Sequence, residues 1–389
     1  MHQGRILLSQ LLDFLPRHEF NGCVKRYHGN RRVRRLSCFD QFLAMVFAQL
    51  TYRESLRDIE ACLGAMRPKL YHAGFRGRVC RNTLASANEK RDWRIWADLA
   101  QMLIVRARTL YADEDFGVEL KQTAYAFDST TISLCLTLFP WAKFRRAKAG
   151  VKLHALLDLR GNIPSFIYIT HGKMHDVKAL DHLPLEAGSF YIMDRGYIDF
   201  KRLHRFPENS AFFIVRAKRT LDFKRQVSRP VDKTCGLRGD QTIVLRGPKS
   251  AKDYPDPLRR VIFYDTETKK RFVFLTNHFT LPALVIAQLY KRRWQVELFF
   301  KWIKQHLRIK AFFGTSENAV RTQVWIAVCV YVLVAIVKKE LHLDKSLYEI
   351  LQILSISLFE NSPILQALLG SYDPIETTAP CNQLELFKS

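Results

Sequence analysis

Acidic residues are scarce in this chain of 389 residues: 37 Asp and Glu stand against 61 Lys and Arg, which leaves a net charge of +24. This excess is far beyond what solubility requires, and it predicts a large polyanionic partner, most simply nucleic acid. The cations are spread widely, with 20 Lys and Arg against 9 Asp and Glu in residues 1–110. An extended contact with duplex DNA is therefore expected, with an affinity that falls steeply with salt.

The chain also lacks the marks of a disulfide framework, a zinc ribbon, an export signal and a membrane span. Its eight cysteines are scattered with no C-x2-C pair, so they are expected to be reduced thiols. The N-terminus has no basic-then-apolar layout with a small-residue cleavage site, which argues against a signal peptide. The longest apolar run, Val324 to Val337, has 14 residues, too few to span a bilayer and typical of a buried core helix. A cytoplasmic protein with no membrane partner is expected.

The hydrophobic pattern changes from helical to strand-like near residue 120. Residues 39–111 carry helical periodicity, and the composition break at 112–120 is predicted to be a linker. The region from 219 to 277 holds short strands separated by Gly, Pro and Asp and is predicted to be a β-rich insertion. A helix is expected to begin near Leu281, so the fold class is α/β. The strands predicted before the insertion are 125–134, 150–159, 162–170, 189–194 and 211–218.

Two aspartates stand out from the strand pattern. Asp128 lies within the first predicted strand, and Asp194 ends a strand of continuous apolar character. Such a strand is expected in a sheet buried on both faces, and α/β sheets place their ligands at the carboxyl ends of central strands. Taken singly, an Asp at a strand end is more often a turn or cap residue.

The stretch YKRRWQVELFFKWIK (290–304) combines charge with aromatic side chains. At about 100° per residue of α-helix, four of its polar residues fall within about 60° of one another: Tyr290, Arg293, Glu297 and Lys304. Three apolar residues lie on the other side and are predicted to face a core: Val296, Phe299 and Ile303. A charged stripe of this kind often only faces solvent, so its function depends on what else the fold brings to it.

Asp128, Asp194 and Glu297 would form a cluster of three carboxylates. Carboxylates that are brought together repel one another unless divalent cations neutralise them, and oxygen ligands suit Mg²⁺ or Mn²⁺. Two such ions about 4 Å apart can activate a water or a 3′-hydroxyl and stabilise the leaving oxygen at a phosphodiester. The cluster therefore predicts nuclease or strand-transfer chemistry.

These motifs resemble those of bacterial cut-and-paste DDE transposases of the insertion-sequence-four family, with a likeness over roughly residues 120–340. FDSTT (127–131) resembles the first acidic motif of that family, and DRGY (194–197) resembles its second, D-x-G-Y/F. Tyr290, Arg293, Glu297 and Lys304 match its Y-R-E-K signature in identity and spacing.

The resemblance implies a ribonuclease-H-like catalytic core. In it, Asp128, Asp194 and Glu297 would be the catalytic residues and would bind Mg²⁺ or Mn²⁺, with two ions at each active site. The polar partners on the same helix, Tyr290, Arg293 and Lys304, would hold phosphates of the transposon end. Some relatives hold a flipped base of a DNA hairpin against a Trp in the β-rich insertion. No Trp occurs between Trp141 and Trp294, so the hairpin step is left open.

The domain organisation that follows has five parts: a helical, basic, DNA-binding domain (1–115), the first part of the core (120–218), the β-rich insertion (219–277), the final part of the core with the acidic helix (278–345) and a C-terminal helical tail (346–389).

Further DNA contacts are expected from basic clusters. Lys301 and Arg308 extend the face of Tyr290, and Arg145 with Arg146 lies in a basic stretch with aromatic residues that could track the DNA backbone. The run RRVRR (31–35) is expected to contact phosphates. The segment 76–83, a basic turn before a helix beginning near Asn82, resembles the entry to a helix-turn-helix recognition helix.

The leading hypothesis is a transposase that binds terminal inverted repeats as a homodimer, cleaves the ends and joins the 3′ ends to target DNA. One alternative is a metal-dependent DNA nuclease without strand transfer. Another is an inert DNA-binding regulator, which the loss of an acidic residue would favour. Asp128, Asp194 and Glu297 are all present in this chain.

Overall fold

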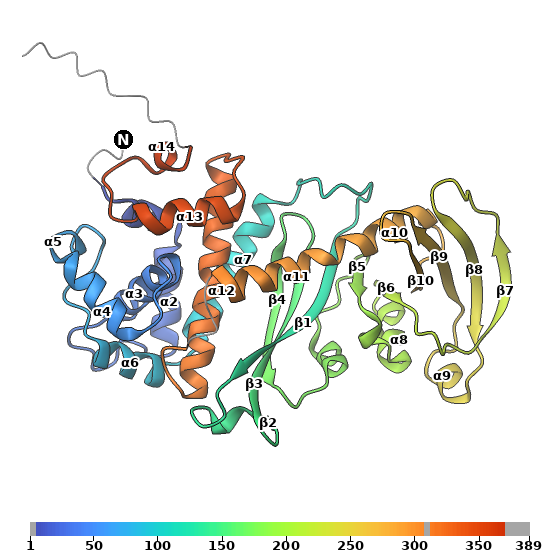
Figure 1. Cartoon of the computed structure of the whole chain (residues 1–389), viewed down its shortest axis with the longest axis horizontal. Helices are drawn as coiled ribbons and strands as arrows, with labels where there is room; N and C mark the ends of the chain where they lie inside the picture. Colours follow the sequence, from blue (N-terminus) through green and yellow to red (C-terminus); the bar gives the residue numbers. More distant parts are fainter. Residues whose placement is uncertain (1–4, 307–311, 370–389) are drawn as a thin grey trace, which may run out of the picture.

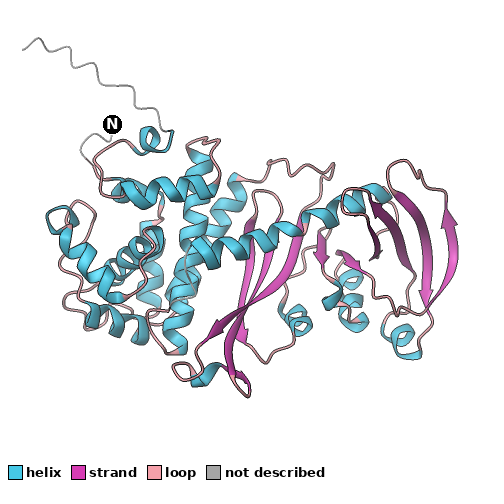
Figure 2. Cartoon of the chain, viewed as in Figure 1, coloured by secondary structure: helices cyan, strands magenta, loops and turns pink. Residues whose placement is uncertain are grey.

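The computed structural model describes residues 5–306 and 312–369. Helices gather at one end, a sheet occupies the middle and a β-rich lobe forms the other end (Figures 1 and 2). The helical character predicted for 39–111 is confirmed. The helices before the sheet are α1 (Leu7–Leu11), α2 (Arg17–Arg26), α3 (Cys38–Leu50), α4 (Leu56–Ala65), α5 (Arg67–Leu70), α6 (Arg81–Lys90) and α7 (Arg94–Leu110).

A capping box fixes the start of α3. The Ser37 hydroxyl accepts a hydrogen bond from the Asp40 amide at 3.1 Å, and the Asp40 carboxylate accepts one from the Ser37 amide at 2.8 Å. These bonds satisfy amide groups that a helix start leaves without an intrahelical partner. The other Asp40 oxygen accepts from the Arg76 amide at 3.1 Å, so the same side chain ties the segment before α6 to α3.

The described residues form one ten-stranded sheet, in which β4 pairs with β3 and the other strands follow the order β2-β3-β1-β5-β6-β10-β9-β8-β7. All five strands predicted before the insertion are present. The strands are β1 (Ala124–Leu134), β2 (Lys143–Arg145), β3 (Lys148–Asp158), β4 (Ile163–His171), β5 (Phe190–Met193), β6 (Phe212–Arg216), β7 (Phe223–Arg229), β8 (Leu237–Leu245), β9 (Leu258–Asp265) and β10 (Lys270–Thr276).

The β-rich stretch is joined to the rest of the sheet edge to edge. β10 pairs antiparallel with β6, and β9, β8 and β7 continue outward from it. The strands predicted between 219 and 277 therefore extend the central sheet. Two short helices pack near this junction: α8 (Phe200–Glu208) and α9 (Pro248–Asp253).

The helices after the sheet are α10 (Ala283–Arg292), α11 (Trp294–Lys301), a π-helical turn (Trp302–His306), α12 (Glu317–Glu340), α13 (Leu347–Ser357) and α14 (Ile364–Leu369). α12 contains the longest apolar run. At 24 residues it is long and apolar enough to cross a bilayer, but 94% of its most apolar window is buried inside the protein. It packs against α7 and α3 and next to the π-helical turn, as expected for a core helix (Figure 1).

One prediction about the helices is wrong. The stretch 290–304 is not one continuous helix: α10 ends at Arg292, Arg293 forms a turn with αR backbone angles, and α11 begins at Trp294. The last turn is π-helical, and it contains Lys304. Angles calculated for an ideal helix therefore do not apply across the whole stretch, because a π-turn has more residues per turn than an α-helix.

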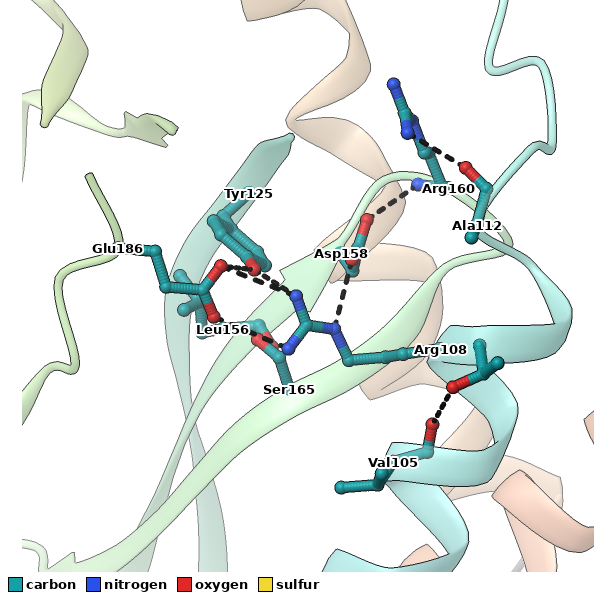
Figure 3. Close-up of polar contacts among 10 residues, drawn as sticks. Val105, Arg108, Ala112, Tyr125, Leu156, Asp158, Arg160, Ser165 and Glu186 are labelled. Carbon is teal, nitrogen blue, oxygen red and sulfur yellow. Dashed lines mark hydrogen bonds and ion pairs between the residues drawn. The ribbon is translucent and has the colours of Figure 1, made fainter. Parts of the chain in front are cut away.

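A polar network around the buried Asp158 docks α7 onto the sheet (Figure 3). Arg108 donates to Asp158 at 3.2 Å and to Glu186 at 3.4 Å, and it also contacts the Tyr125 hydroxyl. Asp158 is almost fully buried, and burial raises the pKa of its carboxyl above the usual value. Asp158 also accepts the Arg160 amide at 3.0 Å. Arg108 is therefore the cation that keeps a buried carboxylate satisfied.

Replacing Arg108 by Ala is expected to lower the free energy of unfolding by about 3 kcal/mol, because it leaves a buried charge without its partner. Arg94→Ala on the same helix is the control. Arg94 pairs with Asp92 but is 57% exposed, so its loss should cost less than about 1 kcal/mol. Urea denaturation of the full chain measures both. Equal losses of unfolding free energy in the two variants would contradict a special role for the network around Asp158.

Candidate active site

Asp128 and Asp194 are brought together by strand register. β1 and β5 run parallel with Phe127 opposite Met193, so the next residue along each strand is an aspartate. Side chains alternate between the two faces of a sheet. Tyr125 and Phe127 pack in the core on one face, while Ala124 and Ala126 pack in the core on the other. Asp128 therefore has its side chain on the same face as Ala126, toward α11.

Helix α11 places Glu297 over the same face. Its buried side chains, Val296, Phe299 and Phe300, pack in the core between the sheet and α12, with the Phe299 ring 5.0 Å from the Tyr331 ring. The predicted apolar back of the helix, Val296, Phe299 and Ile303, is buried, which confirms that prediction. Glu297 is 34% exposed and lies on the opposite side, where the helix meets the carboxylates of the sheet.

Arg293 links two of the three carboxylates. Its Nη1 donates to Asp128 Oδ2 at 2.8 Å, and its Nη2 donates to Glu297 Oε1 at 2.6 Å. The pair with Glu297 has the i, i+4 spacing at which helical side chains meet. The guanidinium is 14% exposed, so water screens these charges little. Arg293 thus offsets part of the negative charge of Asp128 and Glu297 in this structure.

Tyr290 reaches the third carboxylate. Its hydroxyl donates to Asp194 Oδ1 at 3.2 Å, and its ring packs 4.7 Å from the ring of Phe274 on β10. Burial, with the neighbouring Asp194 carboxylate, raises the pKa of Tyr290 to about 12. The phenol therefore stays protonated at neutral pH and acts as a hydrogen-bond donor.

Lys304 approaches the site from the π-helical turn. Its ammonium contacts the hydroxyl of Thr130 on β1. A pocket of about 390 Å³ opens here, and Lys301, which is exposed, lines it as well. The residues around this pocket are Asp128, Ser129, Thr130, Glu297, Phe300, Lys301, Lys304 and Gln305. The pocket is thus acidic at its base and basic at its rim.

Electrostatic repulsion within the site is visible at Asp128. Burial raises the pKa of its carboxyl, and the neighbouring charges of Glu297 and Asp194 raise it further. The Ser129 amide, which donates to Asp128 Oδ1 at 2.8 Å, and the Arg293 guanidinium act in the opposite direction. A site of this kind favours a bound cation.

The donor chemistry fits a hard divalent cation, because all three acids offer carboxylate oxygens. Within residues 5–306 and 312–369, however, no three acidic, His or Cys side chains already surround one point at which an ion could bind. Arg293 lies between two of the candidate ligands instead. A cation that takes both carboxylates has to displace it.

Other predicted contacts lie elsewhere. Arg145 and Arg146 are exposed on the β2–β3 hairpin and do not line the pocket. Arg308 lies outside the described residues. The sequence reasoning missed Ser129 and Thr130, whose amide and hydroxyl meet Asp128 and Lys304. For Thr130 the signal was present in the motif FDSTT, which places a hydroxyl at each position after the aspartate, whereas Ser129 contacts Asp128 through its backbone amide.

Comparison with known proteins gives a consistent result. The family model described as the transposase DDE domain matches residues 119–333, and a domain of unknown function matches residues 3–76. The y4zB protein of Sinorhizobium fredii, named as a transposase, is 31% identical over 284 residues, which cover 72% of this chain and 78% of that protein. A Geobacillus stearothermophilus protein, named as a transposase for insertion sequence element IS5377, is 33% identical over 53% of this chain and 54% of its own length.

A third relative, from Synechocystis, is named as a transposase for insertion sequence element IS4SA and is 26% identical over 69% of this chain and 75% of its own length. Among solved structures, the piggyBac transposase synaptic complex with hairpin DNA aligns over 93% of this chain and 81% of that chain. Its TM-score is 0.45 and its identity 11%, a likeness too low to support an argument.

Proposed function

This chain belongs to the transposase DDE domain family, and we propose that it moves an insertion sequence of the insertion-sequence-four type. In this proposal it binds the terminal inverted repeats of its element, cleaves the DNA at the ends and joins the 3′ ends to target DNA. The relatives named for insertion sequence elements support that assignment.

The observation that carries the proposal is the meeting of three acids from distant parts of the chain. Asp128 and Asp194 come from adjacent parallel strands in matching register, and Glu297 comes from a helix packed on the same face. Arg293 hydrogen-bonds to Asp128 and Glu297, and Tyr290 hydrogen-bonds to Asp194. An arrangement that concentrates negative charge at a partly buried point costs stability, so a function at that point explains why it is present.

In the proposed mechanism, Asp128, Asp194 and Glu297 would hold two Mg²⁺ or Mn²⁺ ions. When bound, such ions activate a water or 3′-hydroxyl and stabilise the leaving oxygen of a phosphodiester. Arg293, once released from the carboxylates, offers a planar pair of donors that suits a phosphate. Tyr290, as a protonated phenol, donates to a DNA oxygen, and Lys304 and Lys301 hold the backbone at the rim.

The rest of the chain is assigned by the same proposal. Residues 1–115 form the DNA-binding domain, 120–218 and 278–345 form a ribonuclease-H-like core, 219–277 form its β-rich insertion, and 346–389 form a C-terminal tail. Arg145, Arg146 and Arg308 supply further contacts to DNA. Both ends have to be cut in concert, so the active assembly is a homodimer holding two ends, and the protein works in the cytoplasm.

Cleavage of a labelled duplex that carries the element's own ends, with Mg²⁺ or with EDTA, tests the proposal. We expect cuts at the element boundary in Mg²⁺ only, followed by joined products when target DNA is added. Boundary cuts without joined products would identify a metal-dependent nuclease. Binding of the ends without cuts in Mg²⁺ or Mn²⁺ would identify an inert regulator. The size of the cleaved ends on a denaturing gel shows whether a hairpin forms.

A further inference from the structure

Four arginines lie together on the loop between α2 and α3. Arg31, Arg32, Arg34 and Arg35 are all exposed. Within the described part of the chain, none of the four guanidinium groups forms a hydrogen bond or an ion pair. Four unneutralised cations in five residues repel one another, so they create a local site of positive potential.

The loop is held in place at both ends. The Asn30 side chain accepts a hydrogen bond from the Cys38 amide at 2.8 Å, which closes the loop. Arg91, directly after α6, donates to the Ser37 carbonyl at 3.0 Å and contacts the Leu36 carbonyl, and it also donates to Gln41 at 2.8 Å. Arg91 therefore fastens the arginine loop beside the end of α6. The position of the four cations relative to that helix is built into the fold.

Helix α6 presents a polar face beside this loop. Leu84, Ala87 and Asn88 are buried, while Thr83, Ser86 and Lys90 are exposed and line a groove of about 810 Å³ together with the four arginines. The hydroxyl groups of Thr83 and Ser86 are small hydrogen-bonding groups. Helix α6 has ten residues and is about 15 Å long. The major groove of B-DNA is about 12 Å wide and admits such a helix.

We propose that this groove seats duplex DNA, with the loop arginines on backbone phosphates and with Thr83 and Ser86 facing base edges. The inference rests on the proposed function, since the duplex would be the end of the element. It assigns a role to the arginine loop, which lies within the residues 3–76 that match a domain of unknown function, and to α6, which follows that match. The groove shares no residue with the catalytic pocket, so binding and chemistry are separable by substitution.

The two kinds of contact predict different losses. Backbone contacts are insensitive to sequence and release counterions, so Arg34→Ala and Arg35→Ala should each weaken binding of every duplex and reduce the slope of log K against log salt by about 1. Base contacts carry sequence information. Thr83→Ala with Ser86→Ala should therefore reduce the preference for end DNA over a shuffled duplex by at least about fivefold and leave the salt slope unchanged.

Fluorescence anisotropy with the full chain, a labelled end duplex and a shuffled duplex, at several salt concentrations, measures these quantities. Arg67→Ala is the matched control, because Arg67 is an exposed arginine on α5 that does not line the groove. Its salt slope should stay within about 0.3 of the wild-type value, since it makes no phosphate contact. All substituted positions are exposed, and unchanged thermal unfolding verifies that the variants are folded.

The outcomes separate this inference from the proposed function. If wild type prefers the end duplex and the loop variants Arg34→Ala and Arg35→Ala behave like Arg67→Ala, the groove does not bind DNA, although the proposed function stands. If the loop variants lose salt slope but the Thr83→Ala, Ser86→Ala variant keeps its preference for the end, base reading by α6 is wrong. If wild type shows no preference for the end duplex, the proposed function fails and this inference fails with it.

Discussion

Glu297→Gln is expected to lower cleavage of end DNA at least about 100-fold, equivalent to about 2.7 kcal/mol of barrier, while end binding stays within about twofold of wild type. The substitution keeps the size of the side chain and an oxygen that can accept from Arg293, but it removes the charge. Glu297 lines the same pocket as Asp128. In the proposed mechanism Glu297 is a metal ligand, and losing one anionic ligand would lower the affinity for divalent cations and their ability to stabilise the reacting oxygens.

Glu317→Gln is the control for this experiment. Glu317 forms an i, i+4 ion pair with Arg321 at 2.7 Å, just as Glu297 does with Arg293, but it lies at the start of α12 and does not line the pocket. Its cleavage rate should equal that of wild type. Single-turnover cleavage under saturating protein separates chemistry from binding. Wild-type cleavage by Glu297→Gln would show that Glu297 is not one of the catalytic acids.

The sequence was sufficient to predict the elements that carry the acids. Asp128 is predicted within one strand and Asp194 at the end of another, and strands lie at both predicted places. Their side-by-side position depends on the pairing of β1 with β5, between residues 66 positions apart. Strand order and register are set by tertiary packing, so a local pattern cannot supply them.

The charged face of the acidic helix was predicted from periodicity, but the hydrogen-bond partners of its side chains within the protein were not. Arg293, between α10 and α11, donates to Asp128, which is 165 residues away in the chain. The stretch 112–120, predicted to be a linker, connects α7 to β1 but is held by contacts: Lys339 pairs with Glu114, and Arg292 donates to the Gly117 carbonyl at 3.3 Å. Such contacts between distant segments leave no periodic trace in the sequence.

Arg293→Ala is expected to make the protein less stable without divalent cations and to strengthen its binding of Mn²⁺. In this structure the guanidinium bonds to Asp128 and Glu297, so its removal leaves two nearby carboxylates to repel each other. The free energy of unfolding in EDTA should fall by about 3 kcal/mol, as when one partner of a buried ion pair is lost. A cation binding the wild type has to break the Arg293 bonds first, whereas one binding the variant does not.

Two titrations of the DNA-free full chain test this reasoning, urea denaturation in EDTA and calorimetry with Mn²⁺. We expect the variant to bind Mn²⁺ about tenfold more tightly, a gain of about 1.4 kcal/mol. Arg321→Ala removes the guanidinium from an equivalent i, i+4 pair outside the pocket and should leave Mn²⁺ binding unchanged. Equal or weaker Mn²⁺ binding by Arg293→Ala would mean that Arg293 does not compete with the cation. Tighter Mn²⁺ binding by Arg293→Ala, together with weaker binding of end DNA, would mean that Arg293 moves from the carboxylates to a phosphate when the cation binds. One guanidinium cannot bond fully to both the carboxylates and a phosphate.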